Sequence, residues 1–196
     1  MKNLSFYAVA ILGLSASAAL ATDTSLYAEA PPEDASFVRF AGFGAAKSAE
    51  FAGKTFTLNA DEQLAYTPVS TAALKGVEPG SYVTVVRSKD GAHHTIPEGP
   101  RAAASKVSLY LINATDQALE LKLADGSVTV IGGVEPMSSG LRAVNPVAIS
   151  FGVFQHGEGA PLATFDVSLR RGQNLTFLAD PSGVRLVENR FGPVAK

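Results

Sequence analysis

The sequence predicts an all-β protein made of two small antiparallel β-sandwich domains. Few windows show the spacing of an amphipathic helix, whereas apolar and polar residues alternate in runs of about four to eight between turn signals. The chain has 196 residues, of which 46% are apolar and 17% charged, and this length suits one or two globular domains. The stretch PEGPRAAAS at 97–105 lacks an apolar anchor. We therefore expect a short Pro/Gly/Ala linker there, between domains at 22–96 and 106–196.

Residues 1–21 have the features of a secretory signal peptide. Lys2 gives a positive start, residues 6–14 form an apolar run, and Ala19-Leu20-Ala21 is a small-x-small cleavage site. The apolar run is shorter than the ~20 residues that a membrane-spanning helix needs. We therefore expect cleavage after Ala21 and a mature periplasmic protein that does not span the membrane.

The first domain opens with an extended, solvated segment at 28–34, which carries two prolines and three carboxylates. A strand is expected at 36–40, where successive side chains point to opposite faces and Arg39 faces away from Val38 and Phe40. Further strands are expected at 51–58, 64–68, 81–87 and 93–96. Asp90-Gly91 supplies the positive φ of a tight turn between the last two strands. The segment 72–75 fits either a short helical turn or a loop.

The second domain begins with an apolar run at 106–113, which is typical of a central strand covered on both faces. The three leucines at 119–123 alternate with Glu120 and Lys122, which predicts one buried face and one solvated face. Residues 147–154 place larger apolar side chains on one face, so this strand is expected at the centre of the core. Other strands are expected at 128–131, 163–169, 174–179 and 184–187. About seven or eight short strands fit an immunoglobulin-like or jelly-roll-like sandwich.

Composition restricts the possible partners. The chain has 16 basic and 18 acidic residues, and loss of Lys2 with the signal leaves a net charge of about −3. Nucleic acid is therefore not expected as a partner. Cysteine is absent, which excludes disulfides, thiolate nucleophiles and thiolate metal ligands.

The sequence shows no catalytic set, and we expect no catalytic residue and no cofactor. There are three histidines and no G-x-S-x-G nucleophile motif. Asp90-Gly91-Ala92-His93 has the Asp-x-x-His form of SGNH-type esterases and acyltransferases, but the Gly-Asp-Ser nucleophile block of those enzymes is missing. A hairpin turn accounts for this motif without any catalytic role.

We also expect no metal site. His93 and His94 are adjacent, so on a strand they point to opposite faces and cannot share one ion. His156 and Glu158 form a single possible ligand pair in a Gly-rich loop, and the acidic pairs lack the spacing of a calcium loop.

Carbohydrate binding is a further interpretation, because sandwiches often bind glycans through exposed aromatic rings. The rings expected to be exposed are Tyr27, Tyr66, Tyr82 and Phe191. Arginines could form bidentate pairs with uronate carboxylates, and a solvated edge or turn is the alternative role for them. These candidate glycan-contact residues are Arg170, Arg171, Arg185 and Arg190.

Four stretches carry a resemblance to a known family. They are LY…AP…SFVR within 26–39, KLADG at 122–126, NPVAISFGVF at 145–154 and LRRGQ at 169–173. In this order and spacing they resemble the alginate O-acetylation protein family AlgF, over roughly 26–188. The resemblance implies a non-catalytic periplasmic accessory protein, or adaptor, that is required for O-acetylation of mannuronate residues during exopolysaccharide biosynthesis.

The resemblance also implies partners, namely a membrane-bound O-acyltransferase and a periplasmic SGNH-type acetyltransferase. As an adaptor, the chain could add its extended arm to a partner's surface. The contact residues expected there are Leu26, Tyr27, Pro31, Pro32 and Phe37. The alternative function is that of a carbohydrate-binding module, which binds the alginate polymer directly and presents it for acetylation.

Overall fold

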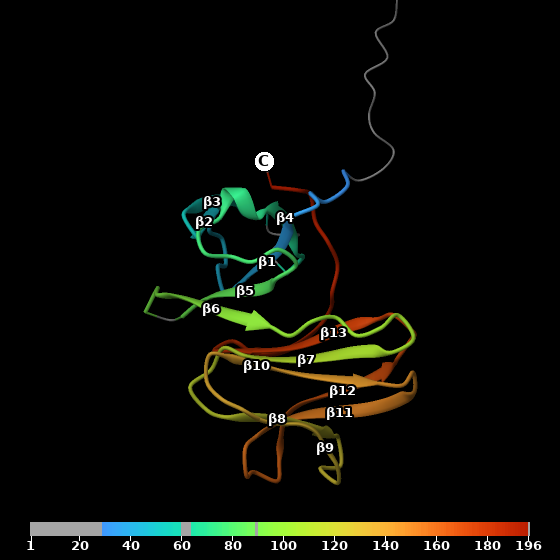
Figure 1. Cartoon of the computed structure of the whole chain (residues 1–196). Coiled ribbons are helices and arrows are strands. Elements are labelled where there is room, and N and C mark those ends of the chain that lie inside the picture. Colours follow the sequence, from blue (N-terminus) through green and yellow to red (C-terminus); the bar gives the residue numbers. More distant parts are fainter. Residues whose placement is uncertain (1–28, 60–63, 89, 196) are drawn as a thin grey trace, which may run out of the picture.

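The computed structural model describes residues 29–59, 64–88 and 90–195, and Figure 1 shows how their strands are arranged. These residues form strands β1 to β14 and one 3₁₀ turn, η1 (Thr71–Ala73). The expected all-β class is confirmed. The predicted cleavage site at Ala21 and the predicted contact residues Leu26 and Tyr27 lie outside the described residues. In the described part of the chain, no helix is long and apolar enough to cross a membrane.

The N-terminal domain is built on one four-stranded sheet of order β4-β1-β5-β6. Its strands are β4 (Thr67–Ser70), β1 (Ala35–Ala41), β5 (Tyr82–Arg87) and β6 (His93–Glu98). A separate hairpin of β2 (Ser48–Phe51) and β3 (Lys54–Thr57) covers the inner face. There the Phe40 ring lies 5.1 Å from the Phe56 ring and 5.5 Å from the Phe43 ring. Val38 and Phe40 thus face the domain core, and Arg39 faces the opposite side.

The C-terminal domain is a sandwich of two four-stranded sheets. One sheet has the order β10 (Ser138–Val144), β7 (Val107–Asn113), β13 (Asn174–Asp180) and β14 (Gly183–Glu188). The other has the order β12 (Pro161–Ser168), β11 (Ala148–Gln155), β8 (Leu119–Leu123) and β9 (Thr129–Val134). Phe177 of β13 lies at the centre of the core, 5.6 Å from the rings of Phe151 and Phe165. Of the expected inward face of residues 147–154, Phe151 and Val153 are buried, whereas Val147 is exposed.

The two domains share one strand arrangement. In the sheet β4-β1-β5-β6 the central pair β1/β5 is parallel and both flanking pairs are antiparallel. The sheet β10-β7-β13-β14 repeats this pattern with the parallel pair β7/β13. Each domain therefore contains one parallel pair in an otherwise antiparallel arrangement.

The outer faces of these two sheets pack against each other, so the domains are stacked (Figure 1). The apolar part of this contact joins three buried residues of the N-terminal domain to three of the C-terminal domain: Ala41, Val86, Ile96, Ile112, Ala114 and Leu178. The chain crosses between the domains twice. It crosses once after β6, and again after β14, where residues 190–195 return to the N-terminal domain alongside β4. We call the stacked contact the seam.

Candidate functional site: the seam between the domains

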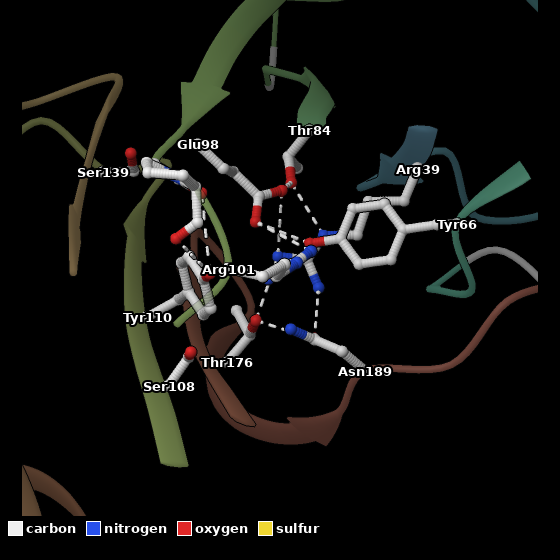
Figure 2. A network of polar contacts seen from close by, with 12 residues as sticks. Arg39, Tyr66, Thr84, Glu98, Arg101, Ser108, Tyr110, Ser139, Thr176 and Asn189 are labelled. Atoms are coloured by element: carbon white, nitrogen blue, oxygen red, sulfur yellow. Dashed lines mark hydrogen bonds and ion pairs between the residues drawn. The ribbon is translucent and has the colours of Figure 1, made fainter. Parts of the chain in front are cut away.

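Arg39 of β1 is the central side chain of the seam (Figure 2). It is 1% exposed, and its Nε donates to Thr84 Oγ1 of the same domain at 2.7 Å. Its other two nitrogens cross the seam: Nη1 donates to Asn189 Oδ1 and Nη2 to Thr176 Oγ1, both at 3.0 Å. One guanidinium therefore ties β1 and β5 to β13 and to the segment that follows β14. Its planar fork of donors suits such a junction.

Glu98, the last residue of β6, supplies the opposite charge. Its carboxylate is fully buried and lies 3.2 Å from Arg39 Nη2. Thr84 Oγ1 donates to one carboxylate oxygen at 2.6 Å, and Tyr66 Oη donates to the other at 2.5 Å. A buried ion pair is tolerated only when further hydrogen bonds satisfy the charged groups, and this pair has them.

Arg101 adds a second, half-buried cation just after β6. Its guanidinium carbon lies 3.9 Å from the ring centre of Tyr82, 4.5 Å from that of Tyr110 and 4.9 Å from that of Tyr66. Aromatic faces attract cations, so three rings from both domains stabilise this charge. Burial raises the pKa values of Tyr66 and Tyr110, which keeps both phenols neutral and able to donate hydrogen bonds.

The seam chemistry is structural. Both Glu98 oxygens and all three nitrogens of Arg39 are used within the protein. Because these directional contacts cross from one domain to the other, they fix the angle between the two sheets.

Replacing Tyr66 by Phe tests the hydrogen bond to Glu98. Loss of a bond to a charged acceptor should lower the free energy of unfolding by about 1.5–3 kcal/mol. Tyr110→Phe is a matched control, because the Tyr110 hydroxyl makes longer hydrogen bonds to neutral acceptors, the carbonyls of Pro100 and Gly99, at 3.3 and 3.5 Å. That variant should lose about 1 kcal/mol or less in urea unfolding. Equal losses in the two variants would contradict the assignment.

The predicted contact residue Phe37 lies at the solvent edge of the seam, in an aromatic group with three of the candidate rings. Its ring stacks on Tyr82 at 4.6 Å and lies 5.2 Å from Phe191. Phe191 is 59% exposed, as expected, and Tyr82 is half-buried. The expected exposure of Tyr66 is wrong, because this ring is buried beneath Arg39 and Arg101.

The extended arm is described from Glu29 onwards. Pro31 is exposed and Pro32 half-buried, and the Pro32 carbonyl accepts a hydrogen bond from Ala35 N at 3.0 Å. This turn leads directly into β1. The assignment of Pro31, Pro32 and Phe37 as partner contacts stays a prediction.

The four candidate glycan arginines do not form one cluster. Arg170 and Arg171 lie in the loop between β12 and β13, where Arg170 faces Glu188 across 3.5 Å. Arg185 lies in β14 and pairs with Asp180. Arg190 follows β14, and its carbonyl accepts from Tyr66 N. A glycan contact at any of them stays a prediction.

A second polar cluster lies in the C-terminal domain, on the sheet β12-β11-β8-β9. Glu120 of β8 was expected on a solvated face, but it is buried, because Lys122 and His156 cover it. Lys122 Nζ lies 2.7 Å from one carboxylate oxygen, and His156 Nδ1 contacts the other. His156 therefore pairs with Glu120 rather than with Glu158. Among the described residues, no three His, Asp or Glu side chains gather as metal ligands.

This cluster predicts a pH dependence of stability. The hydrogen bond from Lys122, and then that from His156, hold the pKa of Glu120 below its ordinary value of 4.5. Such a group stabilises the folded state above its unfolded pKa, and the contribution is lost as pH falls through the folded pKa. Lys122→Met should therefore reduce the loss of stability between about pH 6 and about pH 3. Urea unfolding at both values measures this, and an unchanged loss would contradict it.

The charged residues that organise the seam were not singled out as functional from the sequence. Glu98 and Arg101 lie within the predicted linker, although β6 extends through Glu98. Arg39 did carry a signal, since it is a cation in an apolar strand and faces away from the domain core. Alternation gives the direction of the Arg39 side chain, but a cation on the face opposite the core is ordinarily exposed to solvent, so its burial could not be predicted.

The chain is similar along most of its length to named proteins. It is 29% identical over 187 residues to "Alginate biosynthesis protein AlgF" of Pseudomonas aeruginosa, covering 89% of this chain and 86% of that protein. The protein of the same name from Azotobacter vinelandii is 27% identical over 171 residues, covering 78% of this chain and 76% of that one. A solved structure of the C-terminal domain of AlgF from P. aeruginosa is 28% identical, with a TM-score of 0.36, and covers 43% of this chain and 96% of that one.

The family described as "Alginate O-acetyl transferase AlgF" matches residues 9–176. This match takes in most of the chain, including the SFVR, KLADG, NPVAISFGVF and LRRGQ stretches. The chain therefore belongs to the AlgF family.

Proposed function

We propose that this protein is a non-catalytic, periplasmic accessory protein for the O-acetylation of alginate. In this role it is an adaptor for a periplasmic SGNH-type acetyltransferase, which works with a membrane-bound O-acyltransferase. The observation that carries the proposal is membership of the AlgF family, together with relatives named as alginate biosynthesis proteins. The predicted signal peptide supports the periplasmic location.

The structure supports a non-catalytic role, because the Asp-x-x-His motif at residues 90–93 is explained by a hairpin turn rather than by esterase chemistry. Asp90 Oδ1 accepts from Ser88 Oγ at 2.5 Å and from Ala92 N at 3.1 Å, so its carboxylate is used to hold the hairpin turn. The His93 ring packs 5.0 Å from the ring of Phe43. Asp is among the residues favoured in a turn with this hydrogen bonding, so the turn accounts for Asp90 without a catalytic role.

The fixed arrangement of the two domains at the seam also supports the adaptor role. Partner binding loses less entropy when the binding surface is already held in one arrangement. Because Arg39 and Glu98 join the two domains through buried, directional bonds, surfaces on both domains keep a fixed relative position. A fixed pair of domains is suited to holding a partner enzyme.

Complementation tests the non-catalytic role. Deletion of the gene in the parent bacterium should leave secreted alginate without O-acetyl groups, and the wild-type gene should restore them. His93→Ala should restore the same acetyl content, because His93 has no catalytic role in this proposal. If His93→Ala abolished acetylation at an unchanged protein level and melting temperature, the adaptor role would be contradicted.

Direct binding of the uronate polymer is the second candidate function. It is favoured by the adjacent Arg170 and Arg171, which are both exposed in one loop. Exposed arginines give a salt-dependent attraction to carboxylates. Arg170→Ala with Arg171→Ala should then weaken the affinity for polymannuronate, and an unchanged affinity would remove this assignment.

A further inference from the structure

Three aromatic rings gather at the solvent edge of the seam. Phe37 of β1 and Tyr82 of β5 are opposite each other in the sheet, and their rings stack at 4.6 Å with an angle of 15° between the planes. Phe191 lies 5.2 Å from Phe37 and is 59% exposed. Exposed apolar side chains that cluster, rather than stand alone, are typical of binding surfaces. We call these three rings the aromatic surface.

A cation packs against the aromatic surface. The guanidinium carbon of Arg101 lies 3.9 Å from the ring centre of Tyr82. Arg101 Nη2 lies 3.9 Å from Glu98 Oε2, which is too far for a hydrogen bond. Both terminal nitrogens of Arg101 are buried and find no hydrogen-bond acceptor among the described residues. The fold therefore uses the donors of Arg39 but leaves these donors of Arg101 unused.

The charges at the seam do not balance. In the part of the chain that the structure describes, Glu98 is the one carboxylate within ion-pair distance of Arg39 or Arg101. It lies closer to Arg39, at 3.2 Å, so the two cations and one anion leave a net positive charge on the side where Arg101 lies. Partly buried charges are screened less by salt than exposed ones. The aromatic surface therefore lies in a positive potential.

We propose that the aromatic surface binds a uronate residue of the polymer, with the sugar ring stacked on Phe191 and Phe37 and its carboxylate attracted by Arg101. The C–H groups on the apolar side of a sugar ring pack well on the electron-rich face of an aromatic ring. Rings beside a cation favour a sugar that carries a carboxylate over a neutral sugar. The assignment rests on direct polymer binding, the second candidate function, and places the contact at the seam rather than at Arg170 and Arg171.

Equilibrium binding of the full mature chain to polymannuronate tests the site, with neutral mannan as the comparison polymer. Phe191→Ala should weaken the affinity for polymannuronate about fivefold or more, because it removes the most exposed stacking ring. Arg101→Met should weaken that affinity and also reduce its dependence on salt, because it removes the charge. Mannan should bind the wild type more weakly than polymannuronate does, and Arg101→Met should leave the affinity for mannan unchanged.

Two variants serve as controls for these changes. Leu162→Ala truncates a side chain that is 55% exposed on β12, and Arg87→Met removes an exposed arginine at the opposite end of β5 from Tyr82. Both should bind polymannuronate as the wild type does. If Arg101→Met fails to fold because it alters the seam, Phe191→Ala decides the test, since that ring is mostly exposed.

Three results would overturn the site. The first is an unchanged affinity of Phe191→Ala for polymannuronate; weaker binding by Arg170→Ala/Arg171→Ala would then place the polymer contact in that loop and leave direct polymer binding intact. The second is no binding of polymannuronate by the wild type, in which case direct polymer binding fails as well. The third is that Phe191→Ala weakens binding of the periplasmic acetyltransferase but not of the polymer, which would make the aromatic surface a protein contact.

Discussion

Glu98→Ala should lower the free energy of unfolding by about 3 to 5 kcal/mol, because it leaves a buried guanidinium without its counter-charge. Arg39 is 1% exposed and cannot recover hydration without separating the domains. The same change removes the acceptor for Tyr66 and Thr84. Chemical unfolding of the purified variant measures the effect.

Two variants serve as controls for this prediction. Glu188→Ala removes a carboxylate that faces Arg170 at the surface, and such exposed pairs contribute about 0 to 1 kcal/mol. The double variant Arg39→Met/Glu98→Met removes both buried charges and should be more stable than Glu98→Ala. A loss in Glu98→Ala no greater than that in Glu188→Ala would show that the seam pair contributes little.

Phe177→Ala should cost about 3 to 5 kcal/mol, because it opens a cavity at the centre of the C-terminal sandwich. The ring is fully buried between the two sheets and contacts Phe151 and Phe165. Phe191→Ala is the matched control, because that ring is mostly exposed, and its loss should cost about 1 kcal/mol or less. Similar losses in the two variants would contradict the placement of Phe177 in the core.

The sequence predicted the strands well where apolar and polar residues alternate, but it missed the turn between β2 and β3. Residues 51–58 were expected to form one strand, but the chain turns back at Ala52-Gly53 and pairs β2 with β3. Ala52 has φ 51° and Gly53 has φ 82°. A non-glycine residue rarely adopts such a conformation, so alanine gave no turn signal.

Strand β10 was missed because its sequence does not alternate. SSGLRAV opens with three small residues and mixes apolar and polar ones after them, and it forms a strand because each residue pairs with β7. Gly140 shows the constraint, since a Cβ there would lie 2.4 Å from Ile131 Cγ2 and 2.7 Å from Val134 Cγ2. The small side chain is required by β9 passing close by, which is a tertiary contact that local pattern cannot reveal.

The seam could be predicted only in part for the same reason. The direction of Arg39 follows from strand alternation, but its partners Thr176 and Asn189 lie far along the chain, in the second domain. The composition of residues 97–105 predicted a linker, yet β6 extends through Glu98, whose carboxylate is buried, and the Arg101 guanidinium stacks on Tyr82. A single sequence does not show which distant surfaces meet.

The most direct test of the adaptor account is binding of the mature chain, residues 22–196, to the periplasmic SGNH-type acetyltransferase, measured by calorimetry with and without polymannuronate. The account predicts a stable complex at micromolar concentrations in the absence of polymer. Binding to polymannuronate with no enzyme complex would contradict it, and would make the protein a module that presents the glycan.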